Sequence, residues 1–143
     1  ADKDDPDNRT WLTTRLTPLV QTLEVIRQAA GNRPIIIDSG YRTLAYDQKL
    51  YDADKGAGHV AKPQDSQHPK GRAADILHGK LKPAEMFNLV LESYHAGKLP
   101  DLGGIGLYAT FIHVDVRPRP GSFGGANDGH LAIWGGTRPS NIV

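Results

Sequence analysis

Apolar side chains recur at helical spacing in three stretches of the chain. The first starts at Thr17-Pro18, where threonine can cap a helix and proline fits its first turn, and stops at Gly31-Asn32. The second runs from Pro83 to Gly97, and a weaker pattern predicts another helix over 44–54. The apolar residues on the two stronger stripes are Leu19, Leu23, Ile26 and Ala30, then Met86, Leu89, Val90 and Tyr94. Each strong stripe predicts one buried helix face.

Four short runs have the composition or alternation of β-strands. The β-branched run at 34–38 predicts a buried strand, and 73–77 alternates as a second strand. Residues 103–108 and 111–117 predict two more strands that meet at a turn. Together with the helices, this order predicts an α+β domain with a small, mainly antiparallel sheet flanked by helices.

The 143 residues suffice for a single domain with its own core, and we expect one domain over 1–143. Residues 1–10 are polar and acidic and predict a loose lead-in. Residues 118–143 form a tail rich in glycine and proline, with Trp134 as its one large apolar anchor.

Composition excludes several classes of function. The chain has no cysteine, so thiolate metal sites, thiol nucleophiles and disulfides are excluded. The net charge of +1 argues against nucleic-acid binding, which needs clustered Lys and Arg. No apolar run approaches membrane-spanning length. We expect a monomer with neither a nucleic-acid partner nor a membrane span.

The stretch from Ser66 to Asp75 carries the strongest chemical signal. It reads S-x-H-x-x-G-x-A-x-D, and His68 and Asp75 are both residue types that bind zinc. Gly71 allows a sharp turn between them. Asp75 lies in an otherwise apolar strand, where an unpaired carboxylate is costly and a cation removes the cost.

A third ligand is available in the run from Phe111 to Val116. His113 and Asp115 are two residues apart, so both project from the same face of a strand. Taken alone, the pair is better explained as the solvated polar face of an edge strand. With the earlier motif, His113 completes a set of two histidines and one carboxylate. Such a set leaves a fourth position open, as in catalytic zinc sites.

These motifs resemble those of the zinc D-alanyl-D-alanine metallopeptidases. This group includes D,D-carboxypeptidases, vancomycin-resistance D,D-dipeptidases and phage L-alanyl-D-glutamate endolysins, and it shares its fold with Hedgehog domains. The resemblance covers 16–117 through three motifs: Ser39-Gly40-Tyr41-Arg42, the S-x-H-x-x-G-x-A-x-D run, and Gly104-Ile105-Gly106-x-Tyr108-x-x-Phe111-Ile112-His113-Val114-Asp115. It implies a Hedgehog-like fold, one zinc ion per chain bound by His68, Asp75 and His113, and Arg42 facing the substrate.

One position departs from the family pattern. Many members carry a catalytic Glu or Asp three residues before the last zinc histidine, where this chain has Thr110. Asp115 then becomes our candidate for the general base, as in the branch with a His-x-Asp pattern. The alternatives are that Asp115 orients a metal-bound histidine, that the base lies elsewhere with His130 as the next candidate, or that the domain is inactive.

Two further residues are candidates for substrate binding. Arg42 follows the predicted strand at 34–38 and could bind a substrate carboxylate or a developing oxyanion. Asp38 could orient it. Ser66 could either donate to substrate or cap its own loop. In the tail, Trp134 and His130 could close over the site, but a core tryptophan and a surface histidine are the more frequent outcomes for such residues.

The resemblance implies a zinc-dependent peptidase that hydrolyses peptide bonds in peptidoglycan stem peptides or cross-links, as a carboxypeptidase or an endopeptidase. The alternative is a non-catalytic zinc-binding module on the same fold. A cell-wall substrate implies a periplasmic or extracellular location after removal of a signal peptide, and a phage lysin or tail-associated module is equally compatible.

Overall fold

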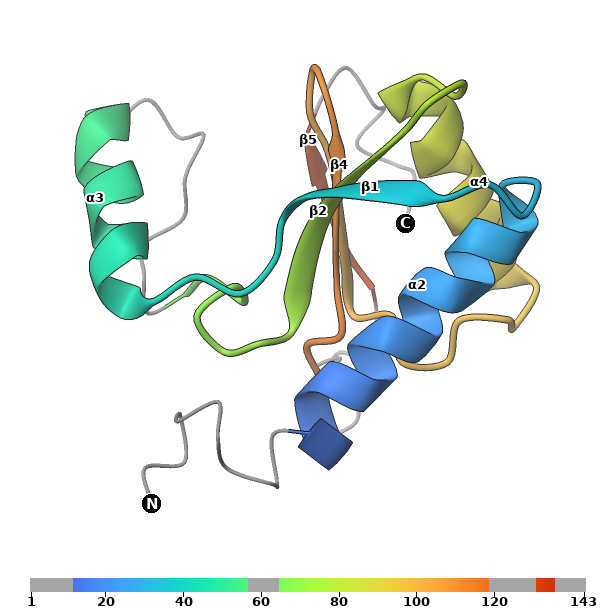
Figure 1. Ribbon diagram of the computed structural model, residues 1–143, viewed down its shortest axis with the longest axis horizontal. Helices are drawn as coiled ribbons and strands as arrows, with labels where there is room; N and C mark the ends of the chain where they lie inside the picture. Colours follow the sequence, from blue (N-terminus) through green and yellow to red (C-terminus); the bar gives the residue numbers. More distant parts are fainter. Residues whose placement is uncertain (1–11, 57–64, 119–130, 136–143) are drawn as a thin grey trace.

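The computed structural model describes residues 12–56, 65–118 and 131–135 (Figure 1). A π-helical turn, η1 (Leu12–Leu16), leads into α2 (Thr17–Ala29). The remaining elements are β1 (Ile35–Ser39), α3 (Leu44–Asp54), β2 (Ala73–His78), α4 (Pro83–His95), β3 (Gly104–Leu107), β4 (Ile112–Asp115) and β5 (Ala132–Gly135). The three helices predicted from periodicity are confirmed, as is the α+β class.

The strands form one five-stranded sheet in the order β1-β2-β4-β3-β5. The pairs β1–β2, β2–β4 and β3–β4 are antiparallel, and only β3–β5 is parallel. The mainly antiparallel sheet predicted from the sequence is therefore confirmed. β2 and β4 lie at its centre, where neighbours on both sides fix their register.

Helices α2 and α4 pack together on one face of the sheet (Figure 1). Their apolar stripes meet alternate residues of the central strands, so one core fills the space between helices and sheet. Its fully buried members include Ile26, Met86, Val90, Ile76, Ile105, Ile112 and Val114. On β2 and β4, the residues that alternate with these core residues along each strand project from the opposite face of the sheet.

The start of α2 differs from our expectation. Thr17 does not cap the helix, because η1 runs directly into it and the capping position is Leu16 in helical conformation with no side-chain hydrogen bond. Pro18 still lies in the first turn of α2, the part of a helix in which proline is favoured.

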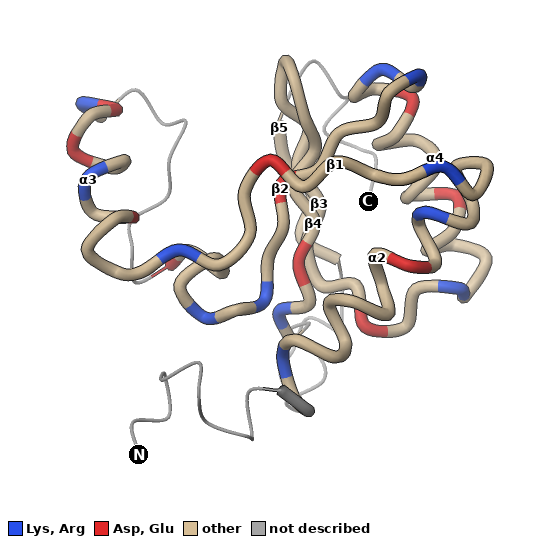
Figure 2. The backbone as a smooth tube through the Cα atoms, in the orientation of Figure 1, with Lys and Arg blue, Asp and Glu red and all other residues tan. Residues whose placement is uncertain are grey.

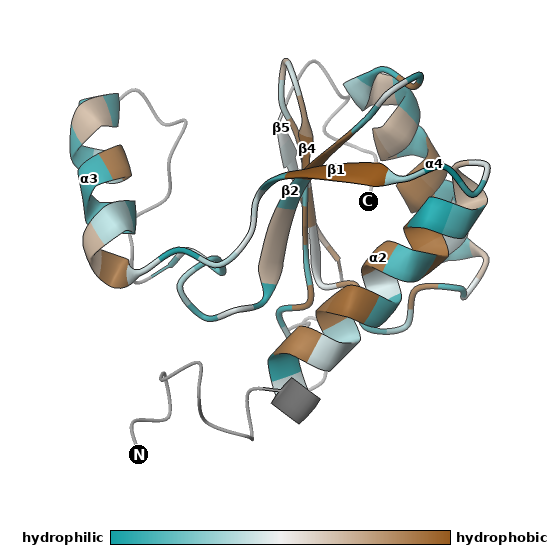
Figure 3. Cartoon of the chain, viewed as in Figure 1, coloured by the Kyte–Doolittle hydropathy of each residue, from teal (hydrophilic) through white to brown (hydrophobic). Residues whose placement is uncertain are grey.

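The prediction that 34–38 is a buried strand is wrong. In the described part of the chain β1 pairs only with β2, so it is an edge strand, and Ile36 and Ile37 are 49% and 56% exposed. Figure 3 shows β1 among the most hydrophobic segments. A run of three isoleucines occurs both in central strands and in edge strands. The sequence of the run does not show whether another part of the protein covers it.

Helix α3 stands away from the sheet, beyond the link that leaves β1 (Figure 1). Thr43 caps it, because its Oγ1 accepts a hydrogen bond from the Tyr46 N–H at 3.1 Å. Asp47 is its one buried residue and is fully inaccessible to solvent.

Strand β5 was not predicted and lies in the tail that begins at residue 118. It pairs in parallel with β3 at the sheet edge opposite β1. The rest of the expected tail, and the expected lead-in over 1–10, lie outside the described residues apart from Pro118 and Leu131.

Within the described residues, no helix is long and apolar enough to cross a membrane. Figure 2 shows Lys and Arg interspersed with Asp and Glu along the helices, rather than gathered into one basic stretch.

The edge position of β1 gives a prediction for two isoleucines that face each other across β1 and β2. Ile76 is fully buried, whereas its partner Ile37 is more than half exposed. Ile76→Ala should lower the free energy of unfolding by roughly 2–5 kcal/mol, and Ile37→Ala by about 1 kcal/mol or less. Urea unfolding followed by circular dichroism measures both, and equal losses would contradict the exposed edge.

Candidate metal centre

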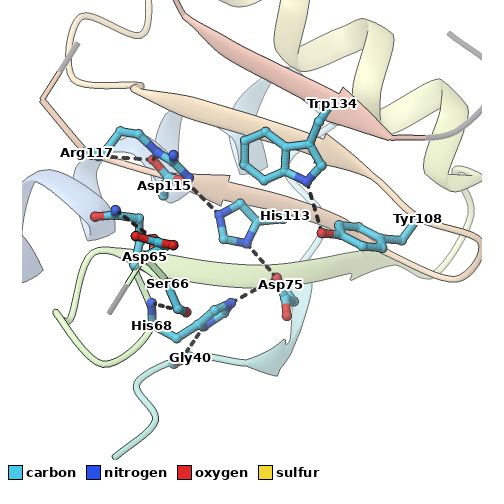
Figure 4. Close-up of polar contacts among 11 residues, drawn as sticks. Gly40, Asp65, Ser66, His68, Asp75, Tyr108, His113, Asp115, Arg117 and Trp134 are labelled. Carbon is cyan, nitrogen blue, oxygen red and sulfur yellow. Dashed lines mark hydrogen bonds and ion pairs between the residues drawn. The ribbon is translucent and has the colours of Figure 1, made fainter. Parts of the chain in front are cut away.

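A single row of residues crosses the sheet on the face that the helices leave open. The strand register places Ser39, Asp75, His113, Gly106 and Trp134 opposite one another in turn, from β1 to β5. Opposed residues on paired strands project from the same face. Asp75 and His113 therefore become neighbours through strand pairing alone (Figure 4).

Asp75 lies between two imidazole rings. Its Oδ1 is 3.0 Å from His113 Nδ1 and 3.3 Å from His68 Nε2. One ligand atom from each of the three residues lies within 4.8 Å of the others, and all three residues are buried. The structure thus brings together the three residues that the sequence motifs pointed to as metal ligands.

His68 reaches Asp75 from the loop that precedes β2. Gly71 has φ +69°, which allows the loop to turn back, and its N–H donates to the His68 carbonyl at 3.1 Å. Ser66 caps this loop, because its Oγ accepts from the His68 N–H at 3.3 Å. His68 Nδ1 lies 2.7 Å from the Gly40 carbonyl, so Nδ1–H donates there and Nε2 is the ring nitrogen that faces Asp75.

His113 is oriented in the opposite sense by Asp115. Its Nε2 lies 2.7 Å from Asp115 Oδ2, so Nε2–H donates to this carboxylate and Nδ1 faces Asp75. Asp115 is fully buried and is also held by Arg117, whose Nε and Nη2 lie 2.9 and 2.6 Å from its two oxygens. The backbone N–H of Arg117 adds a third donor at 3.1 Å. The Asp115 carboxylate is therefore engaged by His113 and Arg117 together.

Glycines on β3 make room for this arrangement. A Cβ atom on Gly104 would lie 2.5 Å from Asp115 Oδ2, and one on Gly106 would lie 2.4 Å from Trp134 Nε1. Any side chain at either position would displace the groups that contact His113. The Gly104-Ile105-Gly106 pattern thus has a steric cause, with Ile105 pointing to the core between the two gaps.

The charged groups around His113 stabilise one another. Burial raises the pKa of Asp75, but hydrogen bonds from His113 and His68 outweigh it and lower the pKa well below its ordinary value. Burial likewise opposes ionisation of Asp115, yet His113 and Arg117 lower its pKa to about 2. For His113, burial lowers the pKa, and hydrogen bonds to Asp115 and Asp75 more than reverse this, so its pKa is raised.

These three residues fit a zinc ion. Two nitrogens and one carboxylate oxygen form a donor set typical of zinc, and three protein ligands leave one position for water or substrate. The ring nitrogen that each histidine turns away from Asp75 is already hydrogen-bonded, to Gly40 in one case and Asp115 in the other. That arrangement is how metal-binding histidines are held in a single tautomer.

Comparison with family models gives a match to the model described as peptidase M15 over residues 6–115. The chain belongs to the peptidase M15 family. Membership makes it a metallopeptidase by family, and the His68, Asp75 and His113 group is where a metal can bind. Comparison with curated proteins and with solved structures gave no significant match.

Arg42, the other residue that the M15 resemblance singled out, is anchored beside the metal group. Its backbone N–H donates to the His68 carbonyl at 3.4 Å. Its Nε lies 3.0 Å from Asp47 Oδ1, an ion-pair contact without good hydrogen-bond geometry. Among the described residues, the side chain of Arg42 thus contacts a buried carboxylate of α3, Asp47, and not Asp38.

Thr110, at the departure from the M15 pattern, lies exposed in the bend between β3 and β4. His130 lies outside the described residues. The sequence predicted no role for Arg117 or Tyr108, but the structure places Arg117 on Asp115 and Tyr108 on Trp134, the two side chains beside His113. The available signal was alternation, because Arg117 continues the series His113, Asp115 on one face of the chain.

Zinc uptake should release protons. The raised pKa of His113 means that the metal-free fold gains stability from the protonated ring below the ordinary value of 6.5, and loses it as pH rises through the raised value. Zinc needs the neutral ring, so zinc affinity should rise with pH and binding near pH 6.5 should release about one proton.

Calorimetry in two buffers of different ionisation enthalpy measures this proton release. His95→Ala, which removes an exposed histidine of α4, is the matched control and should leave zinc binding unchanged. His113→Ala should abolish tight binding. Zinc binding of normal strength in His113→Ala would show that the metal binds elsewhere.

Proposed function

We propose that this M15 family member is a zinc-dependent peptidase that hydrolyses peptide bonds in bacterial peptidoglycan, in stem peptides or in their cross-links. The observation that carries the proposal is the buried His68, Asp75 and His113 group, inside the family match and with both histidines fixed by a second hydrogen bond. The peptidoglycan substrate rests on the resemblance of the sequence motifs.

A bound zinc ion would supply a Lewis acid that polarises the scissile carbonyl and activates the attacking water. The chain's own residues have three tasks around it. His68, Asp75 and His113 hold the ion, the Gly40 carbonyl and Asp115 hold the two rings in one tautomer, and the strand pairing fixes the spacing of the set.

Asp115 fits the role of a positioning group better than that of the general base. Its carboxylate accepts from His113 Nε2 on one side and from Arg117 on the other, which commits both oxygens. With its pKa held at about 2, it is a weak proton acceptor at neutral pH. We therefore propose that Asp115 raises the basicity of His113 and fixes its orientation.

Arg42 is our candidate for binding the substrate carboxylate or the developing oxyanion. A guanidinium can give two parallel donors to such a group, and the backbone contact of Arg42 with the His68 carbonyl holds it beside the metal group. For Ser66, the hydrogen bond with the His68 N–H supports the loop-capping role over direct substrate binding.

A non-catalytic zinc-binding module is the second candidate. Two observations favour it: Thr110 occupies the position where many M15 members have a catalytic carboxylate, and Asp115 is committed to His113 and Arg117. Such a module would bind zinc with the same three residues and leave peptidoglycan intact. For either function, a cell-wall target places the protein in the periplasm, outside the cell or on a phage particle.

Digestion of purified peptidoglycan distinguishes the two functions. The zinc-loaded protein should release fragments with new amino and carboxyl ends, identified by mass spectrometry. Chelation or His68→Ala should abolish their release. The masses also assign the bond: loss of a terminal alanine indicates a carboxypeptidase, and separation of cross-linked stems an endopeptidase. Stoichiometric zinc with no release of fragments would support the non-catalytic module.

Asp115→Asn separates the two roles of that residue. If Asp115 orients His113, the variant should lose roughly 10- to 100-fold in zinc affinity and recover most activity at saturating zinc. If Asp115 is the base, turnover should fall roughly 10²- to 10⁴-fold with zinc retained. Asp101→Asn, at an exposed turn, is the matched control and should change neither quantity. Thermal melts with and without zinc show how much of any loss comes from unfolding.

A further inference from the structure

Trp134 is the last residue of the row that crosses the sheet from Ser39 through Asp75, His113 and Gly106. It is the member of that row that lies outside the family match. The match ends at residue 115, and Trp134 lies beyond it on β5. Parallel pairing with β3 places Trp134 opposite Gly106, which is itself opposite His113. Because Gly106 has no side chain, the indole lies over it and reaches His113, with ring centroids 5.1 Å apart and planes tilted by 49° (Figure 4).

The indole is held in place by contacts on two sides. Its Nε1–H donates to the Tyr108 hydroxyl at 2.9 Å, and the Tyr108 ring stacks on Phe111 with centroids 4.6 Å apart. The Arg117 guanidinium carbon lies 5.1 Å from the centre of the indole, at a cation–π distance. The same arginine binds Asp115, so the indole and the Asp115 carboxylate are positioned together.

These contacts decide what the indole can offer a ligand. Its one polar group is already bonded to Tyr108, so what remains is carbon surface. Trp134 is half-buried, in contrast to the buried His113 beside it, so some of its surface remains accessible to solvent. A tryptophan that served only the core would lie on the helix-covered face, where the apolar residues of β2, β3 and β4 gather.

We propose that Trp134 forms an apolar wall of the peptide-binding site, and that it contacts a small aliphatic side chain on the residue held at the metal. This inference rests on the proposed function and adds a specificity determinant to it. Because the indole contacts His113, a side chain on a residue held at the metal would come within reach of its carbon surface, and carbon surface favours an aliphatic group such as the methyl of alanine over a charged one.

Binding of simple hydroxamates to the zinc-loaded protein tests the contact without requiring hydrolysis. The hydroxamates of glycine, D-alanine and L-alanine share a group that binds zinc and differ by one methyl. Calorimetry should show at least one alanine hydroxamate binding wild type roughly fourfold more tightly than glycine hydroxamate, the equivalent of one buried methylene. Trp134→Ala should reduce this ratio to about one. Trp134→Phe, which keeps an aromatic surface, should retain much of it.

Each other outcome overturns the wall. It fails if Trp134→Ala keeps the methyl preference, if wild type has none, or if wild-type protein with confirmed zinc binds no hydroxamate. A fall in zinc affinity and melting temperature with the preference intact would make Trp134 only a support for His113. If Trp134→Ala does not fold, Trp134→Phe and Trp134→Leu replace it. A methyl preference that Trp134→Phe largely retains and Trp134→Leu loses supports the wall, and any other result overturns it.

Failure of the proposed function looks different. If the protein binds alanine hydroxamate preferentially through Trp134 but leaves peptidoglycan intact, the proposed role of Trp134 stands and the proposed peptidase activity is contradicted.

Discussion

The structure depends on one buried carboxylate. Asp75 sits on a central strand, and its charge is stabilised there only because His68 and His113 both reach the same oxygen. Strand pairing brings His113 into place, and a slip of one residue between β2 and β4 would turn either Asp75 or His113 to the core face. The apolar alternation of both strands prevents that slip, because Ala74, Ile76, Ile112 and Val114 must all face the helices. The hydrophobic core on one face therefore sets the geometry of the polar site on the other.

The residues that surround His113 on β4 and β3 are in turn restricted by its needs. His113 needs a partner for its outer nitrogen, Asp115 supplies it, and Asp115 in turn needs Arg117 because it is fully buried. The space for these side chains comes from β3. On the face that carries the metal group, this strand has Gly104 and Gly106, which have no side chains, where a half-buried strand would normally have polar side chains. Two glycines weaken a strand that stands alone. Here β3 lies between β4 and β5, and Ile105 anchors it in the core.

The sequence predicted what depends on local pattern and missed what depends on neighbours. Helical periodicity found α2, α3 and α4, and the spacing of His68, Asp75 and His113 was informative because a turn and two strands bring them together. The isoleucines of β1 could not reveal that no helix covers them. β5 has four residues in a stretch rich in glycine, and its pairing with β3 is not encoded in its own pattern. For Asp115, alternation predicted the correct face, but only the structure shows that Arg117 holds it.

The order of the strands also separates the candidate metal ligands from the residues that we propose to contact substrate. The candidate metal ligands come from β2, β4 and the loop entering β2, the part of the sheet that α4 packs against. The residues that we propose to contact substrate come from the two ends of the sheet, Arg42 from the link after β1 and Trp134 from β5. Central strands are fixed on both sides, whereas an edge can change without disturbing the register of the centre. The candidate metal ligands thus lie on interior strands or in the loop that enters one, whereas the two groups that we propose to contact substrate lie at the sheet edges, Arg42 inside the family match and Trp134 beyond it.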